Sequence, residues 1–200
     1  MRRLGILLSG RGSNFEAIAE NIARGRLNAE IAAVISNRAE SRGIEIARER
    51  GLPALVLPSK GAPREEYDRR VVAELQDRGV ELVCLAGFMR LLTAEFCQAF
   101  PLRALNIHPS LLPAFPGLDA QRQALEHGAR ISGCTVHFVD EQLDAGPIIL
   151  QAAVPVLDDD TEETLSERIL LEEHRIYSAA IGIILSERWR IEGRRVIAGE

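Results

Sequence analysis

Short apolar segments alternate with longer amphipathic segments through the first half of the chain, and this alternation is the strongest constraint on the fold. The apolar segments are residues 4–8, 31–35, 54–57 and 82–86. Such runs are typical of strands that are buried on both faces of a parallel sheet. The intervening segments, 13–22, 40–50, 63–78 and 93–100, carry helix signals. The pattern predicts an α/β fold with a mostly parallel central sheet and right-handed crossovers.

The second half of the chain follows a different pattern. Two predicted strands, 135–139 and 148–154, are joined by one loop with no helix between them, which favours an antiparallel, hairpin-like addition to the sheet. Residues 160–163 resemble a capping box at the start of a long C-terminal helix. The tail, 189–200, is predicted to form a short strand with a loose end. No segment resembles a linker, so we expect a single domain, 1–200.

Composition limits the class of partner. The chain has 200 residues, 46% hydrophobic residues and a formal net charge of −5, which are ordinary for a globular protein and leave no broad basic surface for nucleic acid. No apolar stretch is long enough to span a membrane. The three cysteines are odd in number and lack metal-knuckle or redox spacing. We therefore expect reduced thiols in a cytoplasmic protein.

The segment Gly10-Arg11-Gly12-Ser13-Asn14 follows the first predicted strand and opens the first helix. Helix N-termini bind anions, and glycines let a phosphate approach the backbone. A dinucleotide is disfavoured, because Phe15 stands where the third glycine is needed and residues 36–38 supply no acid. A P-loop is excluded because no Lys-Ser/Thr pair follows. Either a site for one phosphate or a plain strand–helix turn remains.

Three polar residues have the chemistry of acyl transfer: Asn106, His108 and Asp144. An amide N–H and a protonated imidazole can stabilise an oxyanion, and a carboxylate can orient the imidazole and favour its charged form. Asn106 and His108 fall at the end of a predicted strand, and Asp144 falls in a loop with glycine and proline. Singly, each could be structural, but the combination favours formyl or acyl transfer to an amine without a covalent enzyme intermediate.

Other candidate chemistries are less well supported. Ser110 lies near His108, but no GxSxG elbow is present and prolines flank the segment. His127, His137 and His174 lack recognisable zinc-ligand spacing, so no metal is expected. We interpret His127 as exposed at a helix end and His137 as structural.

Two further features cannot be assigned a role from the residues alone. The segment 87–92 follows a predicted strand at the edge where α/β sheets place ligands, although its residues alone favour ordinary core packing. Glu172 and Glu173 both flank the apolar stripe of the last helix, and periodicity does not choose between them.

Taken together, the chain resembles the family of phosphoribosylglycinamide formyltransferases from residue 4 to about residue 184. The resemblance rests on the segments 9–14, 35–37, 85–90, 106–113 and 133–147. It implies a Rossmann-like formyltransferase fold with 10-formyltetrahydrofolate as co-substrate, no metal and no dinucleotide. It implies small-molecule substrates and no nucleic-acid or membrane partner, and leaves monomer or homodimer open.

The resemblance also implies site residues. The family's catalytic residues match Asn106, His108 and Asp144. The implied ribonucleotide-binding residues are Gly12, Ser13, Asn14 and Glu173. The implied folate-binding residues are Arg64, Met89, Arg90, Leu91, Leu92 and Asn106. One departure is the loop after Pro116-Gly117, where Asp119 and Gln121 stand in place of a family histidine.

Three alternatives remain at this stage. A 10-formyltetrahydrofolate deformylase would use water in place of the amine, and carries an extra N-terminal domain. A methionyl-tRNA formyltransferase carries an extra C-terminal RNA-binding domain. A nucleotide-binding module without catalysis would have no use for a proton-handling pair of side chains.

Overall fold

The computed structural model describes residues 1–199, and they divide into two compact units, residues 1–106 and the described residues from 107 onward. The boundary falls inside a strand, β5, so the chain passes from one unit to the other without a linker. The expectation of a single domain therefore stays a prediction. Each unit is described separately below.

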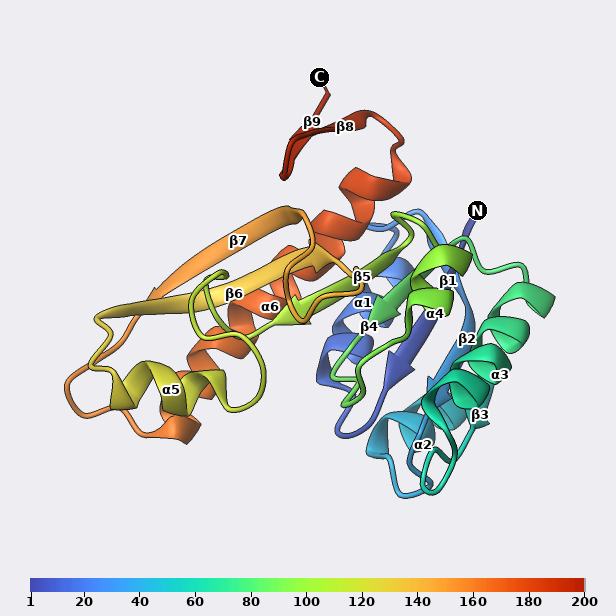
Figure 1. Ribbon diagram of the computed structural model, residues 1–200, viewed down its shortest axis with the longest axis horizontal. Coiled ribbons are helices and arrows are strands. Elements are labelled where there is room, and N and C mark those ends of the chain that lie inside the picture. Colours follow the sequence, from blue (N-terminus) through green and yellow to red (C-terminus); the bar gives the residue numbers. More distant parts are fainter. Residues whose placement is uncertain (200) are drawn as a thin grey trace. The chain divides into compact units, whose positions relative to one another are not determined.

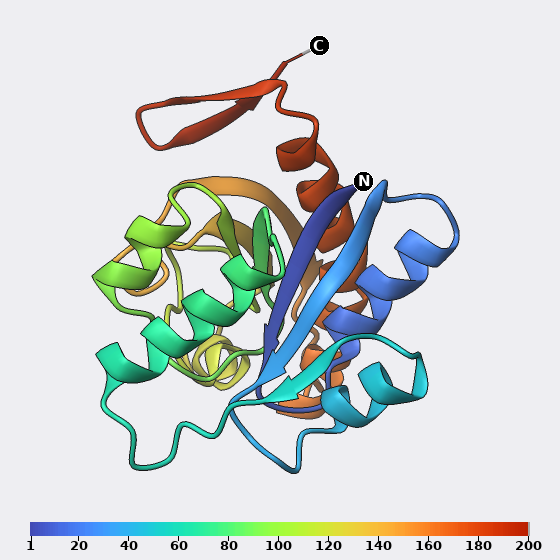
Figure 2. The same cartoon turned by 90° about the vertical axis from the view of Figure 1, so that its right-hand side faces the viewer.

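The first unit is a parallel sheet with helices on both faces. Its strands lie in the order β3-β2-β1-β4-β5, and every pair in this order is parallel. Helices α1 and α2 lie on one face and α3 and α4 on the other (Figure 2). The bounds are β1 Arg2–Leu8, α1 Ser13–Ala23, β2 Ala29–Ser36, α2 Arg42–Glu49, β3 Ala54–Val56, α3 Arg64–Asp77, β4 Leu82–Leu85, α4 Ala94–Ala99 and β5 Ala104–His108.

Burial explains why this sheet forms. Leu4, Leu7 and Leu8 of β1 are fully buried, as a strand covered on both faces requires. The predicted α/β alternation is thereby confirmed, with boundaries that differ by a few residues. The carboxyl ends of β1, β4 and β5 lie at one edge of the sheet, since the strands are parallel and adjacent. That edge is where open α/β sheets bind ligands.

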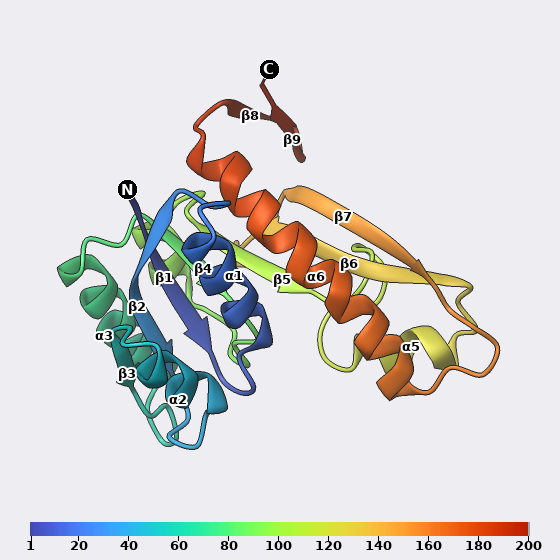
Figure 3. The ribbon, with the colours of Figure 1, turned by 180° about the vertical axis from the view of Figure 1, so that it is seen from behind.

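The second unit contains the antiparallel pair β6 and β7 and a long helix, α6 (Figure 1). Ile149, Ala152 and Val154 of β7 are buried, and α6 runs along β6 and β7 (Figure 3). The bounds are α5 Ala120–Glu126, β6 Ile131–Phe138, β7 Ile148–Pro155, α6 Glu162–Leu185, β8 Trp189–Glu192 and β9 Arg195–Ala198. The predicted antiparallel addition and long C-terminal helix are both confirmed.

Some local predictions were wrong. The capping box of α6 joins Thr161 to Thr164, because the Thr161 hydroxyl accepts from the Thr164 N–H and the Thr164 hydroxyl accepts from the Thr161 N–H. The predicted box was one residue earlier. The tail forms two strands, β8 and β9, in place of one, and Glu200 lies outside the described residues. A helix ending at His127 was predicted without bounds, because seven residues give little periodicity, and the structure shows it as α5.

No helix within residues 1–199 combines the length and the apolar character that crossing a membrane requires. None of the three cysteines, all within residues 1–199, forms a disulfide, and Cys84 and Cys134 are buried. Burial raises the pKa of the Cys134 thiol to about 12, and the charge of Glu173 contributes to this shift.

Candidate active site

The loop after β1 begins α1 with a glycine in a left-handed conformation. Gly12 has φ +82° and occupies the N-cap of α1, and no side chain caps the first turn. A Cβ at this position would lie 2.7 Å from the Cα atom of Gly43. Ser13 and Asn14, which often cap helices, are the first two residues of the helix itself. The first turn of α1 therefore has a glycine at its N-cap and no hydrogen bond from a capping side chain.

Ser9 connects this loop to the loop after β4. Its hydroxyl donates to Asn37 Oδ1 at 2.6 Å and accepts from the Met89 N–H at 2.8 Å. The Ser9 N–H also donates to the Gly87 carbonyl at 3.0 Å. The predicted phosphate loop and the predicted folate segment are thus fixed to each other within the first unit. The hydrogen bond between Ser9 and Asn37 could not be predicted, because the two residues are 28 apart in the sequence.

The segment after β4 exposes some apolar side chains and buries others. Met89 and Leu91 are 57% and 53% exposed, whereas Leu92 is buried. Arg64, at the start of α3, donates to the carbonyls of Leu91 and Leu92 at 3.1 and 3.3 Å. The structure therefore brings together four of the residues that the resemblance assigned to folate. The Arg64 side chain holds this segment by hydrogen bonds to the backbone carbonyls of Leu91 and Leu92.

Arg90 is the fifth residue of that predicted set. Its guanidinium lies over the Tyr67 ring, 4.5 Å from the centroid, a cation–π arrangement. Two of its nitrogens, Nε and Nη2, are buried and have no hydrogen-bond acceptor within residues 1–199. Burial raises the pKa of the Tyr67 hydroxyl to about 12. Buried cationic donors without an acceptor are costly, so an anionic ligand group would be stabilised here.

Asn106 and His108 lie two residues apart on β5. Alternation along a strand places their side chains on the same side of it. Asn106 is half-buried and pairs in register with Leu85 of β4, and His108 is the last residue of β5. The prediction that His108 stands at a strand end is confirmed.

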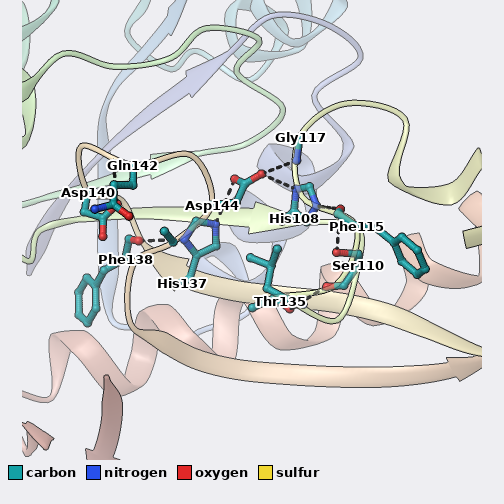
Figure 4. A network of polar contacts seen from close by, with 12 residues as sticks. His108, Ser110, Phe115, Gly117, Thr135, His137, Phe138, Asp140, Gln142 and Asp144 are labelled. Carbon is teal, nitrogen blue, oxygen red and sulfur yellow. Dashed lines mark hydrogen bonds and ion pairs between the residues drawn. The ribbon is translucent and has the colours of Figure 1, made fainter. Parts of the chain in front are cut away.

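His108 is 4% exposed, and both of its ring nitrogens face acceptors (Figure 4). Nδ1 is 3.4 Å from Asp144 Oδ2, and Nε2 is 2.9 Å from the Phe115 carbonyl oxygen. A carbonyl only accepts, so Nε2 carries a proton. The Asp144 carboxylate lies beside Nδ1, so the ring has an acceptor at each nitrogen, which fixes its orientation.

Asp144 lies between two imidazoles. Its Oδ1 is 3.7 Å from Nε2 of His137, and its Oδ2 also accepts from the Gly117 N–H at 2.8 Å (Figure 4). His137 Nδ1 donates to the Phe138 carbonyl at 2.8 Å. Burial lowers the pKa of His137, which favours its neutral form. Sequence analysis interpreted His137 as structural; a bulge in the register between Val136 and His137 is the feature that the sequence did not reveal.

Hydroxyl groups fix the loop that follows β5. Thr135 donates to the Ser110 carbonyl at 2.7 Å and accepts from the Leu112 N–H at 3.0 Å. The Ser110 hydroxyl donates to the carbonyls of Ala114 and Phe115. Ser110 is fully buried, so its hydroxyl orients the loop around His108 and is not placed as a nucleophile.

The remaining predicted residues fall in the second unit. Glu173 is 7% exposed on α6, whereas Glu172 is less buried and pairs with Arg175 at 2.6 Å. Burial thus distinguishes the two glutamates that periodicity did not. His127 is exposed at the end of α5, as predicted. Asp119 is the N-cap residue of α5 and pairs with Arg122. Within residues 1–199, no cluster of three or more His, Cys, Asp or Glu side chains is arranged to hold a metal ion.

Comparison with known proteins gives concordant results. The family model described as formyl transferase matches residues 2–181. Phosphoribosylglycinamide formyltransferase of Escherichia coli strain K12 is 42% identical, over 94% of this chain and 87% of its own. The crystal structure of glycinamide ribonucleotide transformylase 1 from Symbiobacterium toebii is 54% identical, with a TM-score of 0.98 over 100% of this chain and 95% of its own.

A longer relative matches as well. The trifunctional purine biosynthetic protein adenosine-3 of Drosophila pseudoobscura pseudoobscura is 49% identical over 92% of this chain. The chain spans only 14% of the length of that relative.

Proposed function

Because the chain belongs to the formyl transferase family, we propose that it transfers the formyl group of 10-formyltetrahydrofolate to the amine of 5-phosphoribosylglycinamide, a step of purine biosynthesis. The observation that carries the proposal is His108, whose two ring nitrogens both face acceptors, two residues from Asn106 on the same strand. A buried imidazole N–H beside an amide N–H is suited to stabilising an oxyanion.

The reaction proceeds by direct attack. The amine nitrogen of the ribonucleotide forms a bond to the formyl carbon, and the carbonyl electrons move to the oxygen. Asn106 and His108 donate hydrogen bonds to that oxyanion. The attacking nitrogen loses a proton, the oxyanion electrons re-form the carbonyl as the bond from carbon to N10 of the folate breaks, and N10 gains a proton. Asp144, 3.4 Å from Nδ1, orients the His108 ring. The products are the formylated ribonucleotide and tetrahydrofolate.

The Phe115 carbonyl occupies one of the two N–H positions of His108. It accepts a hydrogen bond from Nε2–H, while Nδ1 faces Asp144. His108 can donate a hydrogen bond to an oxyanion only after it gives up one of these two contacts. Phe115 has a left-handed backbone, φ +52°, which is disfavoured for a residue with a side chain. We propose that the Phe115 contact is the one released when the substrates bind.

The substrate assignments follow the chemistry of each group of residues. Gly12, Ser13 and Asn14 at the start of α1 would hold the phosphate of the ribonucleotide, and Glu173 a ribose hydroxyl. Met89, Leu91 and Leu92 would line the pterin pocket, with Arg64 supporting their backbone. The unpaired nitrogens of Arg90 suit a folate carboxylate. No metal or dinucleotide is required.

The deciding experiment follows release of tetrahydrofolate from 10-formyltetrahydrofolate, with and without 5-phosphoribosylglycinamide. Release that depends on the ribonucleotide and yields its formyl product supports the transferase. Release without the ribonucleotide would indicate a deformylase. No release in either case, from folded protein, would leave a binding module without catalysis.

A further inference from the structure

The C-terminal hairpin, which we define as β8 and β9 with their turn, contacts both ends of the loop 139–147. We call this loop the Asp144 loop. At its start, the Trp189 ring lies 5.3 Å from the ring of Phe138. At its end, Arg195 of β9 pairs with Ile148 of β7. The Trp189 indole N–H also donates to the Ile184 carbonyl at 3.0 Å, so the hairpin is fixed to the end of α6.

A third contact reaches into the loop itself. Arg194, in the turn between β8 and β9, donates from Nη2 to the carbonyl of Ala145. Ala145 directly follows Asp144. The two hairpin contacts at the loop ends fix where the loop begins and finishes, whereas the Arg194 contact fixes the peptide beside the carboxylate.

The Asp144 loop needs such a contact because its backbone is strained. Asp144 has φ +49°, a left-handed conformation that residues with a Cβ rarely adopt and that persists only where surrounding contacts hold it. Gly146 packs so closely that a Cβ there would lie 1.9 Å from the Phe138 carbonyl oxygen. A small shift of this backbone would move the Asp144 carboxylate away from His108, 3.4 Å from it at present.

We propose that Arg194 is a positioning residue, which keeps the Asp144 loop in the conformation that presents Asp144 to His108. The inference rests on the proposed function, because its effect on turnover requires Asp144 to act through His108. Arg194 touches no reacting atom. Its loss would lower the fraction of molecules with Asp144 in place, and therefore kcat, without weakening the contacts that bind the ribonucleotide.

The kinetic test compares Arg194→Met with Arg195→Met. Both substitutions remove one positive charge from an exposed position of the hairpin, but Arg195 contributes through its backbone, which pairs with Ile148 of β7 and Glu192 of β8. We expect Arg194→Met to lower kcat on the order of fivefold, the effect of one net hydrogen bond, with KM for the ribonucleotide unchanged. Arg195→Met should match the wild type, and Arg194→Lys, which keeps a charged donor, should recover most of the loss.

A second readout requires no substrate. Amide hydrogen exchange in peptides covering 139–147 should be faster in Arg194→Met than in Arg195→Met or the wild type. Equal exchange in the two variants would overturn the proposal, and so would faster exchange with unchanged kcat. If the wild type showed no transfer at all, the proposed function would fail, while the exchange measurement would still decide whether Arg194 holds the loop.

Discussion

At the scale of single residues, the chemistry depends on what surrounds the His108 ring. His108 has a carboxylate at one nitrogen and a carbonyl at the other. His137 lies 3.7 Å from the same carboxylate, and burial lowers its pKa, which favours its neutral form. The two imidazoles beside Asp144 therefore differ in their partners, and only His108 has an acceptor at each nitrogen together with a place beside Asn106 on β5.

Removing an oxyanion donor should impair turnover without unfolding the protein. We expect Asn106→Ala and His108→Ala each to lower kcat by about a hundred- to a thousandfold. Arg48→Ala, at an exposed position on α2, is the control and should keep kcat within about twofold of the wild type. Steady-state kinetics with circular dichroism of each variant provide the check. Near-normal turnover in folded His108→Ala would contradict the assignment.

At the scale of elements, the start of α1 shows how a backbone requirement selects a residue. Gly12 is left-handed and lies against Gly43, whereas Gly10 has neither a positive φ nor any atom within 4 Å of a Cβ added there. The sequence shows two similar glycines in one motif. The left-handed backbone of Gly12 and its packing against Gly43, at the start of α2, require glycine at position 12 but not at position 10.

These two glycines form a matched pair for mutation. Gly12→Ala should lower the free energy of unfolding by about 1–3 kcal/mol, because a left-handed alanine is strained and its Cβ would clash with Gly43. It should also raise KM for the ribonucleotide. Gly10→Ala should change the unfolding free energy little. Urea denaturation measures both variants, and equal destabilisation would contradict this account of the loop.

The N-terminus of α6 should make stability depend on pH. Hydrogen bonds from Arg168 and from the Leu157 N–H hold the pKa of Asp160 well below its usual range. The native state thus binds this proton less readily than the unfolded chain does. The contribution is present above the unfolded pKa, about 3.9, and is lost as pH falls below it.

We therefore expect Asp160→Asn to lower the urea midpoint at pH 7, with a gap to the wild type that shrinks as pH falls from about 5 towards 2. Asp159→Asn, at the neighbouring exposed position, serves as the control and should leave the urea midpoint nearly unchanged across the same pH range. A gap that stayed constant with pH would show that Asp160 stabilises the helix without its charge.

At the scale of the whole molecule, the sequence predicted most of the architecture and part of the site. Residues 4–8 revealed β1 because both faces of that strand are buried, and periodicity predicted α6. The contact of His108 with the Phe115 carbonyl could not be predicted, because side-chain types do not encode the direction of a loop carbonyl. The C-terminal hairpin was missed because its partners, Phe138 and Ala145, are distant in sequence.

The division into two units has a measurable consequence. Because β5 crosses the boundary at residue 106, unfolding of either unit alone would break a strand in its middle. We therefore expect one cooperative transition, with calorimetric and van't Hoff enthalpies that agree. Two resolved transitions would contradict the single-domain prediction.

The central claim is direct transfer of the formyl group, and one measurement tests it. A single turnover with 10-formyltetrahydrofolate labelled with carbon-13 in the formyl group, followed by NMR, reports where the carbon goes. We predict that the label appears on the glycinamide nitrogen at the rate at which tetrahydrofolate forms, without passing through a species attached to the protein. Label released as formate while the ribonucleotide is present, or label bound to the protein, would contradict the account.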